Sequence, residues 1–153
     1  MAPTGRARLP IFAVAAAVGA AATSCVLPAR STSAYRGKAL STTTAAISAL
    51  ESARFTADLA GRGRLTAAYS SIAMREAETD ASAAQADFDS IQPPNTTSDR
   101  LRAQLDPLLA DAVGTLSTLR IVTRRGDLDR LGHLAADAAK ESRALQQFQE
   151  DHR

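Results

Sequence analysis

The chain has few of the residues that most often carry chemistry. Its 153 residues include one cysteine, two histidines, four phenylalanines, two tyrosines and no tryptophan. One cysteine excludes a disulfide framework within a single chain, and it excludes the paired cysteines of c-type haem attachment. Neither His133 nor His152 belongs to the Glu-x-x-His motif of di-iron helical bundles. We therefore expect no metal or haem cofactor.

Motifs for catalysis are missing as well. The sequence contains neither Gly-x-Ser-x-Gly nor a glycine-rich phosphate-binding loop. Glu76, Asp80 and Asp87 fall near one face of a predicted helix, with Glu78 and Asp89 close by, so they could gather a divalent cation. Carboxylates on a single helix rarely enclose an ion without ligands from elsewhere, and a solvated acidic face is the preferred interpretation. We predict that the protein is not an enzyme.

The first 25 residues are organised like an export signal. Arg6 and Arg8 precede an apolar run over residues 11–22. This run is shorter than the roughly 20 residues of a membrane-spanning helix, and small residues follow it, as in signal peptides. The segment Ala22-Thr23-Ser24-Cys25 resembles the lipobox of bacterial lipoproteins, in which small residues precede a cysteine whose thiol becomes the diacylglycerol attachment point. Ala22 stands where the lipobox usually has leucine.

The resemblance implies that residues 1–24 are a signal peptide and that the mature chain begins at a lipidated Cys25. The protein would then be exported and anchored on the outer face of the cell membrane, stably so because two acyl chains are attached. Residues 25–33 would be the lipidated cysteine and a tether, whose eight residues after Cys25 reach at most about 26 Å. The alternative is ordinary cleavage after Ala22, which would leave a soluble secreted protein with a free Cys25 that could bridge two chains.

The mature chain is predicted to be electrically neutral. Removal of Arg6 and Arg8 leaves 16 basic residues against 16 acidic residues, so there is no global electrostatic basis for binding nucleic acid. Arginine strongly outnumbers lysine and alanine is abundant, a composition that resembles proteins of GC-rich bacteria such as actinomycetes. Since tryptophan is absent and aromatic residues are few, each contact between helices should bury little apolar area.

Apolar residues recur at helical spacing over four segments, 34–60, 64–91, 98–125 and 128–150. The breaks between these segments are predicted by glycines at 61, 63 and 126 and by prolines at 93 and 94. Long helices joined by short loops predict an all-α fold, an antiparallel up-down-up-down four-helix bundle over residues 34–153. The alternative is a pair of long hairpins that complete their core only by dimerising. Pro107 lies inside the third segment and predicts a kink near residues 103–107.

Each predicted helix has one apolar stripe that we expect to be buried. The predicted core residues are Leu40, Ile47, Leu50, Ala57 and Ala60 in the first helix, Leu65, Tyr69, Ile72, Ala77, Ala81, Ala84, Phe88 and Ile91 in the second, Leu101, Leu105, Leu108, Ala112, Leu116, Leu119 and Val122 in the third, and Leu128, Leu131, Ala135, Ala138, Leu145 and Phe148 in the fourth.

Basic residues gather around the first and third predicted loops, which share one end of an up-down bundle. They are Arg62, Arg64, Arg120, Arg124, Arg125 and Arg130. Such a basic end could contact anionic headgroups or a cell-wall polymer. Arginines in the last turn of a helix also complement the helix dipole without any ligand.

These features favour a non-enzymatic lipoprotein of the cell envelope, a helical bundle that presents an interaction surface to an envelope protein or polymer, as a monomer or a homodimer. The alternative is an extracytoplasmic sensor or carrier of a small ligand, which resembles extracellular four-helix sensory domains in architecture alone. A pocket near Pro107 would favour that alternative.

Overall fold

The computed structural model describes residues 31–153, and the predictions for the signal peptide, Cys25 and most of the tether lie outside the described residues. This part of the chain is all-α, as predicted. It comprises α1 (Thr32–Gly61), α2 (Ala67–Asp89), α3 (Thr96–Arg125), a 3₁₀ turn η2 (Leu128–Arg130) and α4 (Leu131–Asp151), and no strand occurs between residues 31 and 153.

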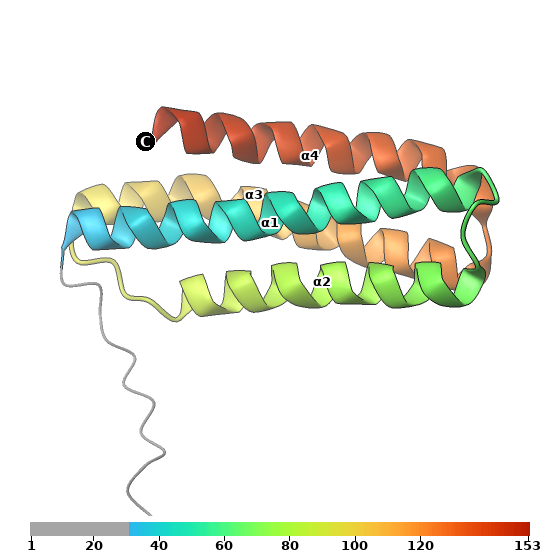
Figure 1. Ribbon diagram of the computed structural model, residues 1–153. Coiled ribbons are helices and arrows are strands. Elements are labelled where there is room, and N and C mark those ends of the chain that lie inside the picture. Colours follow the sequence, from blue (N-terminus) through green and yellow to red (C-terminus); the bar gives the residue numbers. More distant parts are fainter. Residues whose placement is uncertain (1–30) are drawn as a thin grey trace, which may run out of the picture.

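The four helices lie side by side in a bundle-like arrangement (Figure 1). α1 contacts each of the other three helices, whereas α2 and α4 lie on opposite sides of α1 and do not contact each other. The α1–α2 connection and η2 lie at one end, which we call the far end (Figure 1). The α2–α3 connection lies at the other end, together with the start of α1 and the end of α4 (Figure 1). We call this the near end; α1, with 30 residues, spans about 45 Å between the two ends.

Side-chain caps decide where three of the helices begin. The Ser31 hydroxyl accepts from the Ala34 amide at 3.1 Å, the Thr66 hydroxyl from the Tyr69 amide at 3.3 Å and the Asn95 side chain from the Ser98 amide at 3.0 Å. These contacts satisfy amides that have no partner within the first turn of a helix. α1 therefore begins two residues earlier than predicted, α2 begins three residues later, and α3 begins two residues earlier.

The predicted glycine breaks are present at the far end. Gly63 and Gly126 both have positive φ, 66° and 71°, a conformation that costs glycine little. After Gly126 the chain forms η2 before α4 begins at Leu131, so the prediction of one helix from residue 128 is wrong in its first turn. α3 runs without interruption through Pro107, which is exposed, and the kink stays a prediction.

The core is built by all four helices of one chain. Most predicted core residues are buried, among them Leu50, Leu101, Leu105, Leu116, Leu119, Leu131, Leu145 and Phe148. Leu40, Leu65, Ile47, Ala84, Ile91, Leu108 and Ala135 are half-buried. These buried residues form one cluster that joins all four helices.

Three of the predicted core residues are exposed. Tyr69 is 59% exposed, Ile72 49% and Leu128 46%, so the predicted stripe is wrong at these positions. The first half of α2 buries Ser70 and Met74 instead, because an inward stripe that continues from Ala77 and Ala81 at steps of three and four reaches Met74 and Ser70. Leu128 is exposed because it lies in the 3₁₀ turn rather than on the buried face of α4.

Candidate functional site

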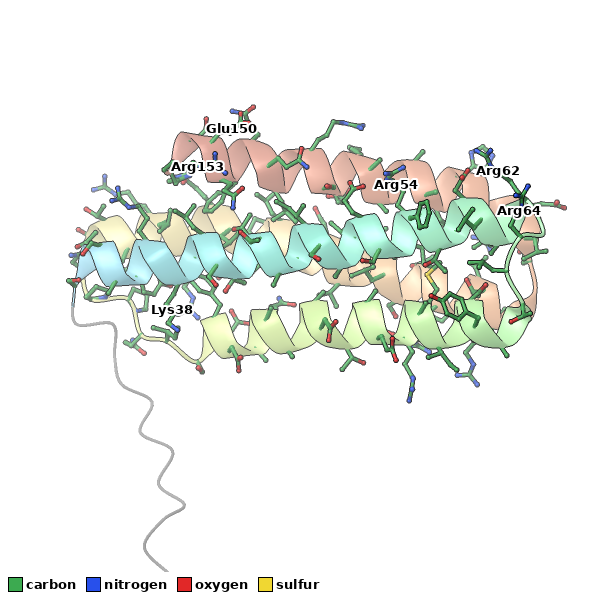
Figure 2. All side chains as sticks on the ribbon, in the orientation of Figure 1. Lys38, Arg54, Arg62, Arg64, Glu150 and Arg153 are labelled. Carbon is green, nitrogen blue, oxygen red and sulfur yellow. The ribbon has the colours of Figure 1, made fainter. Side chains whose placement is uncertain are left out.

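The far end gathers five of the six arginines that the sequence singled out. We call Arg62, Arg64, Arg124, Arg125 and Arg130 the far-end basic cluster. α1 and α3 both end here, and η2 contacts both of them. Figure 2 shows Arg62 and Arg64 side by side at this end, remote from Lys38 and Arg153. All five side chains are exposed.

Three members of the far-end basic cluster have no carboxylate partner among residues 31–153. Arg62 donates to Asp58 at 2.8 Å, and Arg130 lies 3.8 Å from Asp127. Arg64, Arg124 and Arg125 form no ion pair with the described residues. Exposed ion pairs contribute at most about 1 kcal/mol, so an anionic partner could also recruit Arg62 and Arg130.

Arg120, the sixth arginine, has a different position. It forms a two-point ion pair with Glu78 of α2, in which its Nε donates to Oε2 and its Nη2 lies 3.3 Å from Oε1. The Arg120 and Glu78 side chains are only 25% and 20% exposed. They line a groove of about 440 Å³ between α2 and α3. Arg120 therefore connects two helices and does not belong to the far-end basic cluster.

The structure disperses the predicted acidic face. Glu78 is paired with Arg120, and Asp89 lies 3.5 Å from Arg102. Glu76 and Asp80 line a groove of about 590 Å³ between α1 and α2, together with the exposed aromatic rings of Phe55 and Tyr69. Within the part of the chain that the structure describes, no three His, Cys, Asp or Glu residues are placed to hold a metal ion.

The near end contains a smaller cavity that the sequence did not indicate. About 320 Å³ in volume, it is lined by residues of α1, α3 and the C-terminal residues, among them Arg36, Arg100 and His152. The His152 ring stacks on Phe148 with centroids 4.3 Å apart, and its Nε2 lies 3.0 Å from the Gln104 side-chain oxygen. His152 is therefore fixed against α3, while His133 is exposed on α4.

Two ionisable groups in the helix interfaces have shifted pKa values. Burial raises the pKa of the Tyr35 hydroxyl and of the Asp106 carboxyl. Tyr35 Oη and Asp106 Oδ1 are both buried and have no hydrogen-bond partner among the described residues. Both groups lie outside the far-end basic cluster.

Comparison with known proteins gives no relative: no protein family, curated protein or solved structure matches this chain. No helix in residues 31–153 is both long enough and apolar enough to cross a membrane. The signals that sequence reasoning missed are contacts over long separations, such as Arg120 with Glu78, 42 residues apart. Nothing in the local pattern around either residue indicates the other.

Proposed function

We propose that this protein is a non-enzymatic lipoprotein of the bacterial cell envelope that holds an interaction surface away from the membrane. In this proposal residues 1–24 are the signal peptide and Cys25 carries the lipid. The four helices form an antiparallel up-down-up-down bundle whose far-end basic cluster binds an anionic polymer of the envelope.

The observation that carries the proposal is the placement of the far-end basic cluster relative to the start of α1. α1 begins at Thr32, seven residues after Cys25, a separation that spans at most about 25 Å. A lipid on Cys25 would therefore keep the near end close to the bilayer. The far-end basic cluster lies about 45 Å further along α1. This placement favours a partner beyond the membrane over lipid headgroups.

The chemistry of the cluster supports an anionic partner. Arg64, Arg124 and Arg125 are exposed and lack carboxylate partners in the described chain. Guanidinium groups present planar sets of donors that match phosphate and carboxylate oxygens. The cluster is spread over the ends of α1 and α3 and the two connections between helices at the far end, and an extended polymer could contact several of its arginines at once.

The anchor is tested by the intact mass of the full chain recovered from bacterial membranes. A mass that matches a chain starting at Cys25 with a diacylglyceryl group supports the proposal. Recovery of a soluble chain cleaved after Ala22 contradicts it, and would bring forward the soluble carrier that the sequence also allowed.

The surface is tested by binding of the full-length protein to isolated anionic cell-wall polymer at low ionic strength, where such contacts are least screened. The triple variant Arg64→Gln, Arg124→Gln and Arg125→Gln should weaken binding about tenfold or more. The matched control Arg36→Gln, Arg100→Gln and Arg153→Gln removes equal charge at the near end and should change binding less than about twofold. Equal losses in the two triple variants, or no binding by the unmodified protein, would refute this role of the far-end basic cluster.

A further inference from the structure

No other helix of the described residues covers the outward face of α2, although Tyr69 and Glu76 at its edge also line the groove between α1 and α2. α2 contacts α1 and α3 only, and it lies at the edge of the arrangement, on the side of α1 opposite α4 (Figure 1). It buries five of its 23 residues. Exposed residues on the outward face form a line that we call the outer α2 stripe: Tyr69, Ile72, Glu76, Thr79, Ala83 and Ala86.

The spacing of the outer α2 stripe is that of a helix that packs against another helix. Its steps are three, four, three, four and three residues, the heptad pattern of coiled-coil seams. Tyr69 and Ile72 are two of the five large apolar side chains that are exposed in the described chain. The alanines that follow them would let a second helix approach closely at the other end of the stripe.

We propose that the outer α2 stripe binds α2 of a second copy of this chain, with the two helices parallel and in register. In this arrangement Tyr69, Ile72 and Thr79 each meet the same residue of the second copy across a two-fold axis. Ile72 of the stripe and Arg124 of the far-end basic cluster line the same groove between α2 and α3, but the proposed dimer is argued from the stripe alone and does not rest on the proposed function.

Charge complementarity selects the parallel orientation. Arg75 and Asp80 flank the stripe on opposite sides, both are exposed, and neither forms an ion pair within residues 31–153. They are five residues apart, which is the spacing of flanking residues that meet across a parallel helix pair. Arg75 of each copy would therefore face Asp80 of the other. An antiparallel pair would instead bring together sides that carry like charge.

Glu76 limits the strength of the pair. In the parallel register the two Glu76 carboxylates approach each other near the axis, with Arg75 of the opposite copy next to each. The stripe covers about 26 Å of helix, and a single helix pair of this length is small compared with a standard interface. We therefore expect a weak dimer that forms most readily when both copies are held on one surface, where the effective concentration is high. Two parallel copies place both near ends on the same side.

The test is disulfide trapping in the full-length protein. Thr79→Cys places a thiol that faces its counterpart across the axis, and Ala136→Cys, on the exposed face of α4, is the matched control. Under mild oxidation the Thr79→Cys protein should form at least fivefold more covalent dimer than the control. Both variants retain Cys25, so any bridge through Cys25 appears equally in both. Equal trapping of the two variants overturns the proposal.

Charge exchange tests the register. In the Thr79→Cys background, Arg75→Asp should reduce trapping about fivefold, because it brings two acidic side chains together. Asp80→Arg should do the same with two basic ones. Combining Arg75→Asp with Asp80→Arg should restore trapping to within twofold. All these positions are exposed, and unchanged thermal unfolding of each variant excludes loss of the fold as the cause. Failure of the double exchange to restore trapping refutes the parallel register.

Discussion

The two halves of the molecule use their aromatic residues in opposite ways. In the near half Tyr35, Phe88 and Phe148 are buried, and the rings of Tyr35 and Phe88 lie 5.3 Å apart. In the far half Phe55 and Tyr69 are about 60% and 59% exposed. The near half comprises residues 32–46, 78–110 and 141–151, and the far half comprises residues 47–77 and 111–140. Phe55 and Tyr69 line the same groove between α1 and α2, so in the far half the aromatic rings lie outside the core.

The connections between helices at the two ends are held by different kinds of contact. At the near end the Arg102 guanidinium donates to the carbonyls of Asp89 and Ile91, at 2.7 and 3.3 Å, and lies 5.8 Å from the Phe88 ring centre. At the far end the connections are closed by backbone hydrogen bonds, such as the Arg64 amide to the Leu59 carbonyl at 2.9 Å. An arginine side chain thus secures the near-end connection, whereas backbone closure of the far-end connection leaves the Arg64 side chain exposed.

The largest difference between the halves should appear when one aromatic ring is removed from each. Phe88→Ala empties a fully buried site and should lower the free energy of unfolding by about 3–5 kcal/mol. Phe55→Ala removes an exposed ring and should change it by less than about 0.5 kcal/mol. Urea denaturation of the two variants measures both values. A large decrease in the free energy of unfolding for Phe55→Ala would show that the far half depends on its exposed aromatic residues. This result would contradict the proposed difference between the two halves.

A smaller effect is expected from the near-end connection. Arg102→Met keeps most of the side-chain length but leaves the Asp89 and Ile91 carbonyls without their donor, which should cost about 1–3 kcal/mol. Residues 90–95 should also become easier to cleave by protease, because the other side chain that holds this connection, Asn95, contacts Ser98 and Thr32 and secures only its last residue. Arg100→Met, at an exposed position two residues away, is the control. Equal stability of the two variants would show that Arg102 does not stabilise this connection.

The sequence was sufficient for the fold class because leucines mark most of the inward face of α3. Leu101, Leu105, Leu116 and Leu119 are all buried, and these residues follow a single helical period. In the first half of α2 the same reasoning failed. Tyr69 and Ile72 lie on the outward face there, while Ser70 faces inward and donates its hydroxyl to the Thr66 carbonyl at 3.0 Å. Periodicity shows that a helix has an apolar face but cannot say which of two such faces is inside.

The candidate site was predictable in part. The far-end basic cluster followed from loop positions alone, since arginines next to loops on the same end must come together. The role of Arg120 did not follow, because its ion pair depends on how α2 and α3 are rotated against each other. The role of Arg102 was not predicted for a similar reason. Its acceptors are backbone carbonyls 11 and 13 residues earlier in the chain, and every residue has a carbonyl, so the sequence does not indicate which carbonyls accept.

The smallest predicted effects concern two carboxyl groups, one in each half. Burial raises the pKa of Asp106 in the near half, where one of its oxygens is enclosed without a hydrogen-bond partner. In the far half burial also acts to raise the pKa of Glu51, but hydrogen bonds from Ser142 and Arg54 outweigh burial and the pKa is lowered. The two groups should therefore make opposite contributions to the pH dependence of stability.

The sign of each contribution follows from proton binding in the folded and unfolded states. The folded chain holds the Asp106 proton to higher pH than the unfolded chain, so stability from this group falls as pH rises through its ordinary pKa of 3.8 toward the raised folded value. Stability from Glu51 is present above its ordinary pKa of 4.5 and is lost as pH falls through the lowered folded value. The free energy of unfolding should be measured in urea from pH 3 to 7. Asp106→Asn should remove the part of the decrease in this free energy that occurs as pH rises, and Glu51→Gln should remove part of the decrease that occurs as pH falls. If both variants shifted the profile in the same direction, the environments of the Asp106 and Glu51 carboxyl groups would not differ in the expected way. The difference between the two halves would then depend only on whether their aromatic residues are buried or exposed.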